Sequence, residues 1–115
     1  MTTPAIDAPR FAELQATAGA DFVVKLVDTF FEEAPTMLAE LRDARTAQDA
    51  DRFRRAAHSL KSNSYTFGAL PLGALARELE LTGMTSDPAQ DATRLNSLEA
   101  EYGRAAAVLK ELRHG

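Results

Sequence analysis

Residues 53–68, FRRAAHSLKSNSYTFG, carry the pattern that decides the fold of this chain. At about 100° per residue, the turn of an α-helix, the apolar residues and one serine fall within about 40° of one line. They are Phe53, Ala57, Leu60, Ser64 and Phe67. This stripe predicts a helix with one buried side, which begins near Asp49 or Asp51 as its N-terminal cap and ends at Gly68.

Helical spacing of apolar residues continues through the rest of the chain, and no alternating pattern predicts a strand. We expect the other helices over residues 9–18, 21–46, 72–82 and 88–113. Asp21 and Asp87 are the expected N-terminal caps of the second and last helices. Phe22 opens the apolar side of the second helix, and Pro35 within it should kink or split that helix.

The connections between these helices are short, and short connections make neighbouring helices antiparallel. The sequence therefore predicts an all-α fold: an up-down-up-down antiparallel four-helix bundle with a short additional N-terminal helix. A length of 115 residues indicates a single domain over residues 1–115. We expect residues 1–8 to be flexible and the bundle core to span about residues 21–113.

The composition narrows the class of protein. The chain has no cysteine, which excludes a disulfide scaffold, a thiolate nucleophile and a cysteine zinc site. No apolar run approaches the roughly 20 residues of a transmembrane helix, and the N-terminus lacks the pattern of a secretory signal. We therefore expect a soluble cytoplasmic protein that binds no membrane. A net charge of -4 argues against nucleic-acid binding.

The charges are unevenly spread along the chain. Residues 52–77 hold five basic side chains and no acidic one, whereas the rest holds 8 basic and 17 acidic residues. A positive segment on an acidic protein indicates an anionic partner at that place. A chance arrangement of solvated charges is the alternative.

His58 lies inside the positive segment and about 140° from the buried stripe, so it should face solvent. The helix places several residues on the same side or beside it: Asp51, Arg54, Arg55, Lys61, Ser62, Tyr65 and Ala69. This position excludes a buried core histidine and leaves either an ordinary surface histidine or a reactive one. Lys61 and Arg54 can both contact an anion held at the imidazole, and the small Ser62 leaves room for a partner.

Glu80 is the expected partner of the His58 ring. A turn near residue 69 joins the third and fourth helices into a hairpin, and Glu80 is as far after that turn as His58 is before it. A carboxylate there can accept from Nδ1–H, which fixes the tautomer and leaves Nε2 as the basic nitrogen. A solvated helix charge is the alternative for this glutamate.

The pattern His58-x-Leu60-Lys61-Ser62-Asn63-Ser64-x-x-x-Gly68 resembles the signature of histidine-containing phosphotransfer (HPt) domains. Residues 31–35, FEEAP, and the later Leu79-Glu80 are also similar to this family, so the resemblance covers about residues 21–84. It implies a monomeric four-helix bundle whose exposed histidine takes a phosphoryl group from one receiver-domain aspartate and passes it to another.

The resemblance also implies a role for each residue of the motif. His58 is the phosphoacceptor, Lys61 neutralises the phosphate, Glu80 orients the ring and Gly68 ends the helix. The structural positions of the motif are Leu60, Ser64 and Gly68. Ser62 departs from the family pattern because a glycine is usual there, which puts the transfer rate and the choice of partner in doubt. Asn63 is a milder departure.

The expected partners are receiver domains of response regulators or hybrid histidine kinases. They would dock on the exposed face around His58, at Arg55, Ser62, Tyr65 and Ala69, with further contacts from Phe11 and Leu14. The chain has no Gly-rich phosphate loop and no acidic metal cluster near His58. We therefore expect a phosphocarrier that is not an enzyme and holds no cofactor, with Mg²⁺ supplied by the receiver domain.

Three other functions are alternatives to a phosphocarrier. A sensor-kinase dimerisation helix would have an acidic residue after the histidine, where this chain has Ser59, and an ATP-binding domain. A helical adaptor that binds a receiver domain without phosphorylation would not need His58 and Lys61. A metalloenzyme is disfavoured because His58 and His114 are the only histidines.

Overall fold

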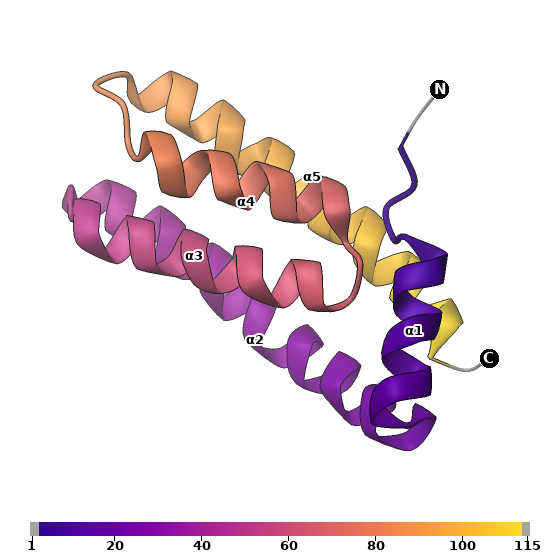
Figure 1. The fold of residues 1–115 in the computed structure, drawn as a ribbon. Coiled ribbons are helices and arrows are strands. Elements are labelled where there is room, and N and C mark those ends of the chain that lie inside the picture. Colours follow the sequence, from indigo (N-terminus) through magenta and orange to yellow (C-terminus); the bar gives the residue numbers. More distant parts are fainter. Residues whose placement is uncertain (1–2, 114–115) are drawn as a thin grey trace.

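The computed structural model describes residues 3–113, and within them every regular element is a helix, as the sequence predicts. The helices are α1 (Ala8–Ala18), α2 (Ala20–Ala47), α3 (Ala50–Thr66), α4 (Leu70–Thr82) and α5 (Pro88–Leu112) (Figure 1). His114 lies outside the described residues. None of the helices described over residues 3–113 is both long and apolar enough to cross a bilayer.

The four longer helices form the predicted antiparallel bundle. α2 packs on α3, α3 on α4 and α4 on α5, and contacts between α2 and α5 close the ring. The short α1 packs against α2 at one end of the bundle (Figure 1). The bundle measures 44 × 30 × 19 Å.

The apolar stripe of residues 53–67 is buried along its whole length. All five of its residues belong to the core: Phe53, Ala57, Leu60, Ser64 and Phe67. The Phe67 ring lies 5.2 Å from that of Phe30 in α2, whose ring is in turn 5.8 Å from that of Tyr102 in α5. The aromatic contacts therefore join three helices. Phe22 was wrongly placed in the apolar side of α2, because 53% of it is exposed.

Two of the expected helix caps form and one does not. The Asp49 side chain accepts a hydrogen bond from the Arg52 amide at the start of α3, and Asp87 accepts one from the Ala89 amide at the start of α5. Gly19 occupies the N-cap position of α2 instead of Asp21. Asp21 lies in the first turn, where its charge favours the positive end of the helix dipole.

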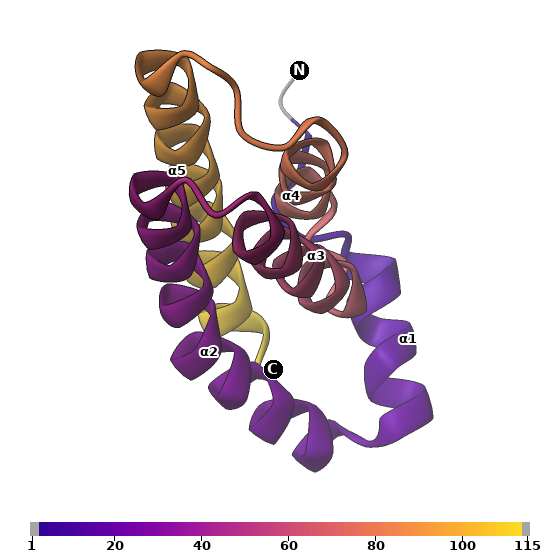
Figure 2. The ribbon, with the colours of Figure 1, turned by 90° about the vertical axis from the view of Figure 1, so that its left-hand side faces the viewer.

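Pro35 does not split α2, which continues from Ala20 to Ala47. The proline removes one backbone donor, and the missing hydrogen bond loosens the helix at this place. The ribbon of α2 bends along its length, so that its first half turns toward α1 (Figure 2).

The sequence predicted a flexible segment over residues 1–8, but residues 5 and 6 within it pack into the core. Ala5 and Ile6 are buried in the core, and the Asp7 amide donates to the Gly68 carbonyl at 2.8 Å. Gly68 has a φ of +76°, and a Cβ atom on it would lie only 3.1 Å from the Asp7 carbonyl oxygen. Glycine is therefore required at this turn both by the backbone angle and by the segment packed on it.

Candidate functional site

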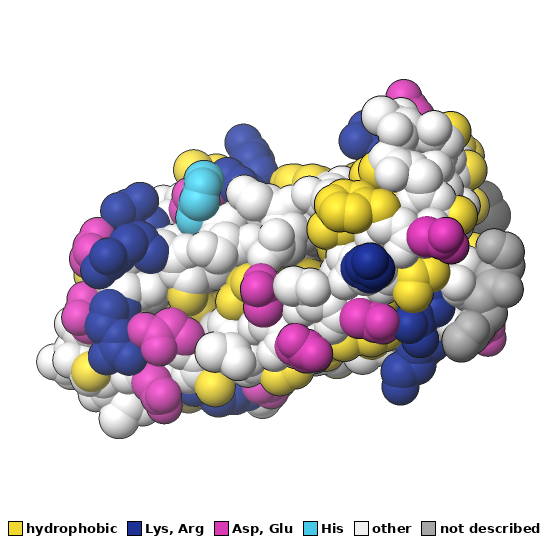
Figure 3. Space-filling model, turned by 90° about the horizontal axis from the view of Figure 1, so that it is seen from below, with side chains coloured by type: hydrophobic (Ala, Val, Ile, Leu, Met, Phe, Trp, Pro, Cys, Tyr) yellow, Lys and Arg dark blue, Asp and Glu magenta, His cyan; other side chains and the backbone are white. Residues whose placement is uncertain are grey.

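His58 lies near the middle of α3, on the side that points away from the core. Its side chain is 56% exposed. The space-filling view shows the ring at the surface, with dark-blue Lys and Arg side chains near it (Figure 3). The structure therefore excludes a core histidine, as the helix geometry predicts.

Glu80 of α4 holds the His58 ring. Its Oε2 atom lies 2.6 Å from Nδ1 of His58, and only 14% of the glutamate side chain is exposed. A carboxylate can only accept, so in the neutral ring Nδ1 carries the proton and Nε2 keeps its lone pair. The register of the α3–α4 hairpin predicted this contact correctly.

Lys61 binds the other oxygen of the same carboxylate. Its Nζ atom lies 2.6 Å from Glu80 Oε1. The hydrogen bond from Lys61 is the main cause that holds the pKa of Glu80 below its ordinary value, and the bond from His58 adds to it against the effect of burial. Glu80 thus stays ionised while it bridges the lysine and the imidazole. The sequence did not predict the contact between Lys61 and Glu80.

Three of the other cations of the positive segment, Arg52, Arg54 and Arg55, are paired with acidic residues that lie outside it. Arg54 and Arg55 both contact Asp51, at 3.0 and 2.7 Å, and Arg52 contacts Glu40 of α2 at 2.8 Å. The spacing of three and four residues between Asp51 and the two arginines is the sequence signal that indicates these pairs. The positive charge near His58 is therefore smaller than the sequence alone suggests.

The expected docking residues do not all reach the surface. Ser62 is exposed, and Tyr65 is half-buried against Gly73 of α4, where an added Cβ would lie 2.7 Å from the tyrosine ring. Ala69 is fully buried, which corrects the prediction, because α3 ends at Thr66 and its helical geometry does not extend to residue 69. Phe11 is also buried and offers no contact surface.

The structural residues of the motif fix the end of α3. Leu60 is fully buried, and the Ser64 hydroxyl donates to its carbonyl at 2.6 Å. The Ser64 carbonyl accepts from the Ala69 amide at 2.9 Å, across the turn that Gly68 makes possible. The hydroxyl of the buried Ser64 thus has its hydrogen-bond partner within α3, and the Ser64 carbonyl closes the turn that follows.

A shallow groove of about 440 Å³ runs between α2 and α3. It is lined by Thr36, Met37, Glu40, Arg52, Arg55, Ala56 and Ser59. This groove could not be predicted from the sequence, because residues of two helices form it. The small residues Ala56 and Ser59, three positions apart on α3, were the available signal.

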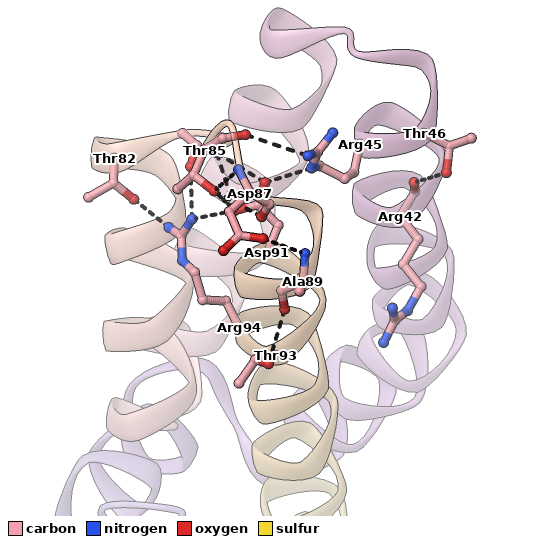
Figure 4. A network of polar contacts seen from close by, with 11 residues as sticks. Arg42, Arg45, Thr46, Thr82, Thr85, Asp87, Ala89, Asp91, Thr93 and Arg94 are labelled. Atoms are coloured by element: carbon pink, nitrogen blue, oxygen red, sulfur yellow. Dashed lines mark hydrogen bonds and ion pairs between the residues drawn. The ribbon is translucent and has the colours of Figure 1, made fainter.

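A second polar cluster lies at the end of the bundle where α4 turns into α5 (Figure 4). Asp91 of α5 is only 1% exposed and accepts hydrogen bonds from Arg45, Thr85 and Arg94. This cluster could not be predicted from the sequence, because its members come from three separate segments. Over residues 3–113 no three or more His, Cys, Asp or Glu side chains gather closely enough to hold a metal ion.

Comparisons with known proteins agree with one another. The model of the Hpt domain matches residues 25–113. Among solved structures, histidine-containing phosphotransfer protein B (HptB) from Pseudomonas aeruginosa PAO1 is similar, with a TM-score of 0.87 and 28% sequence identity. The likeness covers 98% of this chain and 97% of that one. None of the curated proteins matches the chain.

Proposed function

Because the chain belongs to the Hpt domain family, whose function is histidine phosphotransfer in phosphorelays, we propose that His58 carries its phosphoryl group. One observation carries this proposal: the Glu80 carboxylate holds Nδ1 of the exposed ring at 2.6 Å and leaves Nε2 free. Proteins with this domain are phosphocarriers rather than kinases.

The transfer is a displacement at phosphorus. The Nε2 lone pair of neutral His58 attacks the phosphorus atom of an aspartyl phosphate in line, and the bond from phosphorus to the aspartate oxygen breaks as the N–P bond forms. The Nδ1 proton stays on the ring, which becomes cationic, and the Glu80 carboxylate stabilises that charge. The reverse steps pass the phosphoryl group to the next aspartate.

Lys61 is the side chain best placed to stabilise the phosphoryl charge. An ammonium group has three N–H donors, so Lys61 can keep its bond to Glu80 and still donate to a phosphoryl oxygen on His58. Arg54 lies one turn before His58 and is bound only by its exposed pair with Asp51. Such pairs are weak, so its guanidinium can turn to an arriving phosphoryl group at small cost.

Receiver domains are the partners, since Hpt domain proteins act with them in phosphorelays. They would dock over the exposed face that carries Arg55, Ser62 and Tyr65. Working as a monomer, the chain would hold no cofactor of its own, and the receiver domain would bring the Mg²⁺ that phosphoryl transfer needs.

Incubation with a phosphorylated receiver domain tests the proposal. The wild type should gain a phosphate that is labile in acid and stable in base, and His58→Gln should gain none while its melting temperature stays near that of the wild type. A His114→Gln variant is the matched control and should accept phosphate normally. If His58→Gln accepts phosphate as well as the wild type, the assignment is wrong. If no variant accepts it, but all bind the receiver domain, the chain is an adaptor.

A further inference from the structure

The Glu80 carboxylate must be positioned accurately to bind both His58 and Lys61. Each of its oxygens accepts one bond of 2.6 Å, one from His58 and one from Lys61, and a shift of about 1 Å would break either bond. Glu80 lies in the last turn of α4, which ends at Thr82. The carbonyls of a last helical turn lack partners within the helix, so this is the part of a helix that frays most easily.

Arg94 of α5 closes that exposed end. Its Nη1 donates to the Gly83 carbonyl at 3.0 Å, and its Nη2 donates to the hydroxyl of Thr82. The Thr82 hydroxyl in turn donates to the Glu78 carbonyl at 2.8 Å. A cation at a helix C-terminus also interacts favourably with the helix dipole. The last turn of α4 is therefore tied to α5 through one guanidinium group (Figure 4).

Arg94 is itself held in place by Asp91. The carboxylate lies 3.1 Å from Arg94 Nη1, and its other oxygen binds Arg45 of α2 at 2.6 Å. The Thr85 amide and hydroxyl donate to the same carboxylate, so the connection between α4 and α5 is fixed as well. A buried acid with donors on both oxygens gives the guanidinium one defined position.

We propose that Arg94 is a positioning residue for the phosphotransfer site, which acts by holding the last turn of α4 and hence Glu80 against His58. The inference rests on the proposed role of His58. Arg94 touches neither the imidazole nor any group that reacts. Its effect passes through the α4 backbone to the tautomer of the ring.

The test measures the tautomer of His58 and the rate of phosphorylation separately. In a His114→Gln background His58 is the only histidine, and its ring ¹⁵N shifts report which nitrogen carries the proton. The spectra are taken at the alkaline end of a pH series, where the ring shifts no longer change with pH. The rate is measured with a phosphorylated receiver domain.

The wild type should show mainly the Nδ1–H tautomer. Arg94→Gln should raise the share of Nε2–H, the tautomer that the ring of free histidine favours, and slow phosphorylation by about 3- to 10-fold. Arg94→Lys, which keeps a cation for the Gly83 carbonyl, should recover part of both effects. Should Arg94→Gln fail to fold, Thr82→Val removes one acceptor of Arg94 and carries the same test.

Arg42→Gln is the matched control. Arg42 joins α2 to Glu99 and Asn96 of α5, at 2.6 and 2.8 Å, and none of these contacts involves α4. This variant should lose stability without a change in the tautomer. The inference is overturned if Arg94→Gln lowers the melting temperature but keeps the wild-type tautomer and rate. If the tautomer responds but His58 never accepts phosphate, the proposed function fails while the positioning role stands.

Discussion

At the scale of single residues, we expect Ser62 to limit how closely a partner can approach His58. It lies one turn after the histidine on the exposed side of α3, and its carbonyl accepts a hydrogen bond from the Thr66 hydroxyl at 3.0 Å. A glycine, the residue usual in the family pattern, would leave more room but would weaken the helix. We therefore expect Ser62 to keep α3 more stable than a glycine would, while its side chain leaves slightly less room for a partner at His58.

We expect Ser62→Trp to slow phosphotransfer from a receiver domain by at least about 10-fold, because the indole would cover the approach to Nε2. The free energy of unfolding should change by less than about 0.5 kcal/mol, since the site is exposed. Ser62→Gly should transfer at least as fast as the wild type and lose about 0.5 kcal/mol of stability. Stopped-flow transfer assays and urea denaturation measure these effects.

Ala100→Trp places the same bulk on an exposed position of α5, a helix that does not pack on α3, and serves as the control. Transfer should be normal in this variant. Equal rates for Ser62→Trp and Ala100→Trp would contradict a docking surface at Ser62.

Some contacts of single side chains can be predicted from the sequence, and others cannot. The contact between His58 and Glu80 could be predicted, because hairpin register places the two backbones opposite each other. The bond from Lys61 to Glu80 could not, because a helical projection does not tell which way a long side chain turns. The roles of these residues in transfer stay predictions until the variants are measured.

At the scale of elements, the turn between α3 and α4 sets the register on which the site depends. Gly68 combines a positive φ with close contacts on its Cβ side, 3.1 Å to the Asp7 carbonyl oxygen and 3.2 Å to Arg10 Cβ. The sequence predicted a glycine that ends the helix. It could not predict the packed N-terminal segment, because that contact joins residues far apart in the chain.

Gly68→Ala should lower the free energy of unfolding by about 2 kcal/mol or more, from backbone strain and crowding together. Gly103→Ala is the matched opposite case, because Gly103 lies inside α5, is exposed and has nothing within 4 Å of an added Cβ. It should stabilise the protein by about 0.5 to 1 kcal/mol. Urea denaturation of both variants measures the two changes in unfolding free energy. If both substitutions changed it by the same amount in the same direction, the turn would not require glycine at position 68.

At the scale of the whole molecule, helix order and antiparallel packing followed from the sequence because each helix carries a clear apolar stripe and the loops are short. The polar contacts between residues far apart in the chain could not be predicted from the sequence. Asp91 reads as an ordinary surface acid in the first turn of α5, yet it is 1% exposed and joins α2, α5 and the connection between α4 and α5. Only the assembled bundle brings its partners together.

The Asp91 cluster should make the stability of the bundle sensitive to acid. Burial alone would raise the pKa of Asp91, but hydrogen bonds from Thr85, Arg45 and Arg94 outweigh it and hold the pKa below its ordinary value. A carboxyl whose pKa is lower in the folded than in the unfolded protein stabilises the fold above its unfolded pKa. That contribution is lost as the pH falls through the folded pKa.

Asp91→Asn should therefore cost about 2 to 4 kcal/mol of unfolding free energy at pH 7, because one carboxylate oxygen becomes an NH₂ group that faces donors. The deficit should stay constant down to about pH 5 and shrink below about pH 4, where the carboxyl of the unfolded wild type takes up a proton before that of the folded protein does. Urea denaturation across this pH range measures the difference. Glu99→Gln, which removes the half-exposed acid that pairs with Arg42, should cost less than about 1 kcal/mol. A deficit for Asp91→Asn that stays unchanged at pH 3 would show that its carboxylate charge does not stabilise the bundle.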